Sequence, residues 1–159
     1  MGVTDWNWAL EADRQDYPWD CAAASLAWCL RTIGMDYTEQ EVIAGLGPAR
    51  VNDTWGLMDA SGAGIVAWLA TIGVMSENSA LASWSDVQAA AGYQPMLMGG
   101  RKWYHWVAVR MGSETIGKPE LNALALMNPA PGWMGIDQVM HTEDFAELGS
   151  FSAVWFTSW

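Results

Sequence analysis

The 159-residue chain has 18 acidic and 7 basic residues and a formal net charge of −11. This balance argues against nucleic acid binding, which needs a basic face to displace counterions, and against binding to anionic membrane surfaces. The content of 52% hydrophobic and 16% charged residues is that of a globular protein. The length is that of one ordinary domain, so we expect a single domain over residues 1–159.

No segment of the sequence predicts membrane insertion or classical secretion. The longest apolar run, residues 65–73, is too short to span a bilayer. Residues 1–7 lack the basic start and the apolar stretch of a secretory signal. We therefore expect a protein that is cytoplasmic or exported without a classical signal peptide.

The first half of the chain reads as helical. Apolar residues at helical spacing predict a helix over Cys21–Ile33, with Asp20 as its N-cap and Gly34 as its stop. The capping box Thr38–Glu41 predicts a second helix that ends near Gly45. Two further helices are expected, one over Ser61–Thr71 and one that opens with a capping box at Ser85–Gln88 and stops at Gly92.

After Pro95 the pattern changes to short apolar and aromatic runs, which are typical of strands. Strands are predicted over residues 96–98, 103–111, 121–127, 134–140 and 151–157, with a short helix capped by Thr142 and running through Leu148. Helices first and mostly consecutive strands afterwards predict an α+β fold with an antiparallel sheet.

The two cysteines, Cys21 and Cys29, are expected to be free thiols. Eight positions apart on one helix, they would lie about 12 Å apart along its axis. A disulfide needs Cα atoms within roughly 7 Å. The sequence thus leaves at least one cysteine available for chemistry.

Cys21 is the candidate nucleophile because it opens a helix, where the helix dipole favours the reactive thiolate. The alternative is a small buried hydrophobic residue, which is the commoner role of a free cysteine. Gln15 lies six residues before Cys21. Its amide could form half of an oxyanion hole, with the backbone N–H of Cys21 as the other half. A glutamine in a loop is otherwise usually solvated.

His105 begins a predicted strand, and a strand holds a side chain as rigidly as a general base requires. The other histidine, His141, precedes a helix in a polar loop and is interpreted as solvated. Asn128 ends the next strand. If the two strands form an antiparallel hairpin, Asn128 and His105 fall near the same end of the sheet, where the amide could fix the imidazole tautomer. The alternatives are an ordinary core or edge histidine for His105 and an Asn-Pro turn for Asn128.

The order Gln15, Cys21, His105, Asn128 resembles the papain-like cysteine peptidase superfamily. The flanking segments 20–27, 105–109, 127–132 and 142–145 resemble the branch that cleaves double-glycine bacteriocin leaders. This resemblance implies a papain-like fold in which N-terminal helices pack on an antiparallel sheet. It also implies that Cys21, His105 and Asn128 form a triad and that Gln15 contributes to the oxyanion hole.

Two departures weaken any transfer of substrate specificity. Ala22 stands where the branch usually has glycine, and Asn128 stands where it more often has aspartate. The Asp20-Cys21 pair also resembles cell-wall amidohydrolases of the NlpC/P60 type. Those usually have Ser-Gly after the cysteine and a second histidine as third group, so Asn128-Pro129 fits the first family better.

The chemistry expected from these residues is cleavage of a peptide or amide bond through a thioester. An ion pair with His105 is expected to lower the pKa of Cys21. Trp19 and Trp106 neighbour the candidates and are predicted to wall the substrate cleft. No cofactor motif and no zinc-ligand spacing is present in the sequence, and the expected partner is a peptide or protein, with peptidoglycan peptides as one possibility. A non-catalytic peptide- or glycan-binding module, an acyltransferase and a deamidase remain as alternatives.

Overall fold

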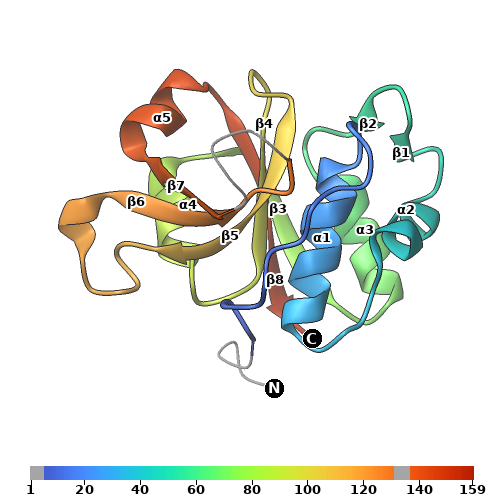
Figure 1. Cartoon of the computed structure of the whole chain (residues 1–159), viewed down its shortest axis with the longest axis horizontal. Coiled ribbons are helices and arrows are strands. Elements are labelled where there is room, and N and C mark those ends of the chain that lie inside the picture. Colours follow the sequence, from blue (N-terminus) through green and yellow to red (C-terminus); the bar gives the residue numbers. More distant parts are fainter. Residues whose placement is uncertain (1–5, 131–136) are drawn as a thin grey trace.

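The computed structural model describes residues 6–130 and 137–159, and in this part of the chain it shows an α+β fold (Figure 1). The helices are α1 (Cys21–Thr32), α2 (Glu39–Leu46), α3 (Ala63–Thr71), α4 (Trp84–Ala90), α5 (Thr142–Glu147) and the 3₁₀ helix η1 (Pro119–Leu121). The strands are β1 (Val51–Asn52), β2 (Gly56–Leu57), β3 (Met75–Ala82), β4 (Met96–Gly100), β5 (His105–Gly112), β6 (Ala123–Met127), β7 (Asp137–His141) and β8 (Phe151–Ser158).

Six strands form one sheet in the order β3-β8-β4-β5-β6-β7, and every neighbouring pair is antiparallel. The predicted α+β class with an antiparallel sheet is therefore confirmed. β1 and β2 pair separately as a small hairpin. The layer of α1, α2 and α3 lies beside the sheet, and the β1–β2 hairpin lies at the edge of this helical layer (Figure 1).

The central strands are buried on both faces, so their side chains divide between two apolar clusters. In β5, Ala108 packs into the cluster that contains α1, while Val107 and Val109 pack into the cluster with Phe145 of α5. This alternation follows from the two-residue period of a strand. It explains why β5 reads as a continuous apolar run although it belongs to an antiparallel sheet.

Helix α1 lies between the sheet and the rest of the helical layer. Of its twelve residues, Arg31 alone is not buried. Both cysteines lie on this helix and are free thiols, as predicted. Because the helix is enclosed along its length, the position of its first residue, Cys21, is fixed by packing on several sides.

Three local predictions are corrected. β3 was not expected, because its sequence MSENSALA is polar and has weak strand character. The capping box of α4 is formed by Ser83 and Asp86, and not by Ser85, because Ser83 accepts the Asp86 amide. α5 begins at Thr142, and its N-cap is His141. The first residues of the strand predicted over 134–140 lie outside the described part of the chain.

Two helical glycines give a test of this packing. A Cβ on Gly45 of α2 would lie 2.4 to 2.7 Å from the Trp68 indole, whereas one on Gly64 of α3 would meet the flexible Arg50 side chain at 3.2 Å. We expect Gly45→Ala to destabilise the protein by about 1–3 kcal/mol, because a buried indole must move. Gly64→Ala should be neutral or stabilising by up to about 1 kcal/mol. Urea unfolding of both variants checks this, and equal effects would contradict the packing.

Candidate active site

Cys21 lies at the start of α1 with 9% of its surface exposed, and it is tied to the start of β5. Its Sγ accepts a hydrogen bond from the backbone N–H of Trp106 at 3.4 Å. One turn along the helix, Ser25 Oγ donates to the carbonyl oxygen of the same Trp106 at 3.3 Å. The two side chains lie on one face of α1 because they are four residues apart. Together they fix the thiol against the strand that begins with His105.

His105 and Asn128 meet at one end of the sheet, as the hairpin argument predicted. β5 and β6 pair antiparallel, so the start of β5 and the residue that follows β6 lie at the same edge. His105 Nε2 is 2.7 Å from Asn128 Oδ1. The imidazole also contacts the Trp103 ring edge-to-face, with a centroid distance of 5.0 Å. The ring is therefore held both by a hydrogen bond and by an aromatic wall.

The orientation of the Asn128 amide is set by a residue that the sequence did not indicate. Asn128 Nδ2 donates to Gln138 Oε1 of β7 at 2.8 Å, and both residues are buried. Asn128 Oδ1, which also accepts the Ala130 amide at 3.1 Å, is then the atom that faces His105. An amide oxygen can only accept, so Nε2 must donate. In the neutral imidazole, Nδ1 therefore carries the lone pair that can take a proton.

Cys21 and His105 open into the same cavity, which has a volume of about 960 Å³. Its lining includes Trp19 and Trp106, the two residues predicted to wall a substrate cleft, together with Gly99 and Gly100 of β4. Further around the rim the lining mixes acidic, basic and aromatic side chains, from Asp53, Trp55, Asp59, Arg101 and Tyr104. The candidate nucleophile and base thus share a space large enough for several residues of an extended peptide.

Trp19 and Trp106 contribute to this cavity in different ways. Trp19 is half-buried and stacks on Tyr17, with ring centroids 5.6 Å apart. Trp106 is buried, and its indole packs on Gly99 so closely that a Cβ there would lie 2.3 Å from the ring. Trp19 is therefore a rim residue, whereas Trp106 shapes the floor.

Gln15 is not among the residues that line the cavity. Its side-chain nitrogen donates to the carbonyl oxygen of Tyr17 at 2.5 Å, and its buried Oε1 has no hydrogen-bond partner among the residues that the structure describes. Its backbone N–H is tied to the Pro129 carbonyl at 3.0 Å, next to Asn128. Gln15 is therefore tied by its backbone to the residue that follows Asn128, and its side-chain amide binds within its own loop and not in the cavity.

The ionisation of Cys21 differs from the sequence-based expectation. Burial raises the pKa of the Cys21 thiol, and the hydrogen bond from Trp106 and the first-turn amides offset this only in part. Burial also lowers the pKa of His105, against the opposing effect of its hydrogen bond to Asn128. The expected lowered pKa of Cys21 is therefore wrong for this geometry. Both shifts favour the uncharged forms, the thiol of Cys21 and the neutral imidazole of His105.

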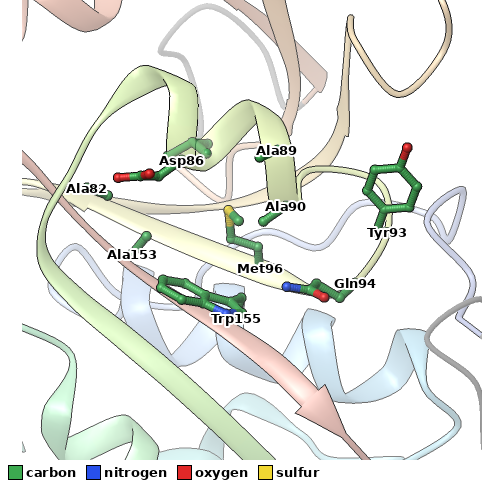
Figure 2. Close-up of a pocket in the computed structure, with 10 residues that line it drawn as sticks. Ala82, Asp86, Ala89, Ala90, Tyr93, Gln94, Met96, Ala153 and Trp155 are labelled. Carbon is green, nitrogen blue, oxygen red and sulfur yellow. The ribbon is translucent and has the colours of Figure 1, made fainter.

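A second cavity, of about 450 Å³, lies on the other side of the sheet between α4, β4 and β8. Figure 2 shows Met96 and Trp155 on its sheet side, with Asp86 and Tyr93 toward opposite ends. None of the candidate site residues lines it. Its lining is mostly apolar and holds no nucleophile next to a base.

Residues 6–130 and 137–159 contain no group of three or more His, Cys, Asp or Glu side chains that could hold a metal ion. In the same ranges, no helix combines the length and the apolar character needed to cross a membrane. His141, interpreted as solvated, is exposed.

Comparison with known proteins gives matches at the level of structure. No family model matches the chain, and no curated protein matches its sequence. Among solved structures, the chain is similar to a double glycine motif protease from an AMS/PCAT transporter in complex with the leader peptide, with a TM-score of 0.69 and 17% identity over 94% of this chain and 91% of that one.

It is also similar to the peptidase domain of Streptococcus ComA, a bi-functional ABC transporter involved in quorum sensing, with a TM-score of 0.65 and 19% identity over 94% and 98% of the two chains. The Streptococcus mutans ComA peptidase domain in complex with a small-molecule inhibitor gives a TM-score of 0.55 at 16% identity over 92% and 98%. The chain therefore has the fold of these peptidase domains, and the resemblance predicted from its sequence is confirmed at the level of the fold.

The hydrogen bond from Asn128 to Gln138 predicts a measurable effect on His105. Gln138→Leu leaves a buried amide N–H unpaired, so we expect a loss of about 1–3 kcal/mol of stability. The freed amide can also turn, and the ¹⁵N shifts of the His105 ring should then show a loss of the tautomer protonated at Nε2. The shifts of His141, which is exposed, serve as the internal control. A His105 tautomer that stays unchanged in this variant would contradict the proposed orientation.

Proposed function

We propose that the protein is a cysteine-dependent hydrolase that cleaves a peptide or amide bond, with Cys21 as nucleophile, His105 as general base and Asn128 as the residue that orients it. The observation that carries this proposal is the hydrogen bond of 2.7 Å between His105 Nε2 and Asn128 Oδ1 beside the Cys21 cavity. It gives His105 the tautomer that a base acting through Nδ1 requires.

In this mechanism the neutral imidazole takes the thiol proton as the substrate carbonyl is attacked. A C–S bond forms between Cys21 and the carbonyl carbon, and the carbonyl electrons move onto oxygen. His105 then returns the proton to the leaving amine as the C–N bond breaks, which leaves a thioester. Water attacks the thioester, releases the acid and restores the thiol.

The developing oxyanion would be stabilised by the backbone N–H of Cys21 and the side chain of Gln15. Gln15 would have to exchange its hydrogen bond to the Tyr17 carbonyl for one to the oxyanion. Because a preorganised donor is worth more than one that must move, Gln15 contributes less in this resting geometry than a fixed donor would.

A peptide or protein is the substrate class that the site supports best. The double glycine motif protease of similar fold holds a leader peptide. The cavity in this chain has a volume of about 960 Å³, which suits an extended segment. Peptidoglycan peptides and a glutamine side chain contain the same type of amide and remain within the proposal. We also propose that residues 1–159 form the single domain that carries out this reaction.

A binding module without catalysis is the second candidate, and the raised pKa of Cys21 favours it, because a protonated buried thiol is a weak nucleophile. This candidate predicts that Cys21→Ala leaves peptide binding intact and that the native protein forms no acyl adduct. An acyltransferase would differ from a hydrolase in passing the acyl group to an added amine.

The proposal predicts cleavage of members of a peptide library, detected by mass spectrometry of the products. Native protein should cleave and show a transient acyl adduct on Cys21, whereas Cys21→Ala should do neither, with a loss of at least about 10⁴-fold in rate. Cys29→Ala is the matched control and should keep the activity, because Cys29 is fully buried and its Sγ contacts the Met96 carbonyl.

An added amino acid amide should leave most of the native products as free acids if the protein is a hydrolase. Transfer of most of the acyl groups to this amine, in preference to water, would assign the acyltransferase reaction. Peptides that bind to both native protein and Cys21→Ala, with no cleavage and no adduct in either, would contradict the enzyme and support the binding module.

A further inference from the structure

Glu39 is a buried acidic residue that the proposed reaction does not use. It is the first residue of α2 and is 6% exposed, although it belongs to a capping box whose acids would be expected to face solvent. Glu41, two residues later, does the capping: its carboxylate accepts the Thr38 amide at 2.8 Å. Glu39 instead turns inward toward the loop that precedes Cys21.

The Glu39 carboxyl holds this loop, residues 15–20, by two contacts. Its Oε1 accepts the backbone N–H of Asp16 at 3.2 Å, and it shares a hydrogen bond with the carboxyl of Asp20. Asp20 is fully buried. It occupies the N-cap position of α1, as predicted, but its side chain makes no capping hydrogen bond to this helix. Its two oxygens accept the Tyr17 amide at 3.1 and 3.2 Å.

Two carboxyls in hydrogen-bond contact require a proton between them. Both oxygens of Asp20 already accept the Tyr17 N–H, which leaves Glu39 as the carboxyl that donates in this contact. Burial, the hydrogen bond to Asp20 and the charges of Asp20 and Asp16 raise the pKa of Glu39 to about 9. Asp16 and Asp20 are the charged groups that act on Glu39 from the loop, and both oppose its ionisation.

The loop held in this way carries Gln15 at one end and the rim residue Trp19 near the other, and it ends where Cys21 begins. We propose that Glu39, in its protonated form, is a positioning residue that fixes this loop against the N-terminus of α1. This role rests on the proposed function, because it is the acyl-transfer site that needs the loop in place. Ionisation of Glu39 would put two negative charges in contact and push the loop away from α2.

Protonation of Glu39 makes the stability of the protein depend on pH in a definite direction. The folded state keeps the Glu39 proton up to about pH 9, whereas the unfolded chain loses it near the ordinary value of 4.5. Unfolding between these pH values therefore releases a proton, so the contribution of Glu39 to stability is complete below pH 4.5 and is lost as pH rises toward 9. Glu39→Gln keeps an acceptor for Asp16 and a donor for Asp20 without a titrating proton.

The first experiment compares the melting temperature of native protein and Glu39→Gln from pH 5 to pH 9. The melting temperature of native protein should fall relative to that of Glu39→Gln across this range. Glu143→Gln is the control, because Glu143 lies in the first turn of α5 and is exposed, and it should follow the native curve. A constant difference between native protein and Glu39→Gln over this range would overturn the proposal.

The second experiment measures hydrogen exchange at the Asp16 and Tyr17 amides. Glu39→Leu should raise their exchange by about tenfold, since one hydrogen bond is lost and the loop is released, while Glu39→Gln should preserve the native protection. Unchanged exchange in Glu39→Leu would overturn the proposal. Both experiments are independent of substrate, so they decide on Glu39 even if no peptide is cleaved and the proposed function fails.

If the native protein cleaves peptides, Glu39→Leu should lower kcat by about tenfold or more with a smaller change in KM, because the loop places groups around the reacting carbonyl. Glu39→Gln should restore most of the activity. Equal loss of activity in Glu39→Leu and Glu39→Gln would overturn the positioning role, because only the carboxamide keeps the contacts.

Discussion

The arrangement of the site depends on the antiparallel pairing of β5 with β6. This pairing brings the first residue of β5, His105, to the residue that follows β6, Asn128, with 2.7 Å between Nε2 and Oδ1. The peptide groups of Trp106, the next residue of β5, bind the side chains of Cys21 and Ser25 from α1. One strand end therefore positions both the imidazole and the thiol, and the helix and the sheet cannot shift independently without breaking these contacts.

Burial favours the uncharged forms of both groups at this site. The same enclosure that fixes Cys21 raises its pKa, and the enclosure of His105 lowers its pKa, so both shifts are toward the form that carries no charge. A reaction that starts from the uncharged forms requires His105 to take the proton of Cys21 as the sulfur attacks. The tautomer of His105 then matters more than the fraction of Cys21 that is already ionised. Asn128 and Gln138 set that tautomer, and Glu39 contacts the loop that leads into Cys21.

The residues that could be predicted from the sequence are those whose local pattern matches their role. Cys21 opens a helix, and His105 and Asn128 lie at the ends of consecutive apolar strands, so hairpin pairing alone brings them together. The role of Gln138 could not be predicted from the sequence. In β7 the polar Gln138 is buried and the apolar Val139 beside it is exposed, which is the reverse of the usual pattern. Glu39 lies in a capping box, and its sequence context is that of a solvated acid. The polar strand β3 becomes a strand through its pairing with β8, which no local pattern shows.

The central claim is that His105 acts as the base for Cys21, and the most direct test is the rate of iodoacetamide labelling at Cys21 from pH 4 to pH 9, in native protein and in His105→Ala. Labelling at Cys29, whose pKa is raised by complete burial, is the internal control. In native protein, the rate should rise as His105 loses its proton, below the ordinary histidine pKa, and then level off. In His105→Ala, it should rise only at the alkaline end of the range. Identical curves for the two proteins would contradict the account.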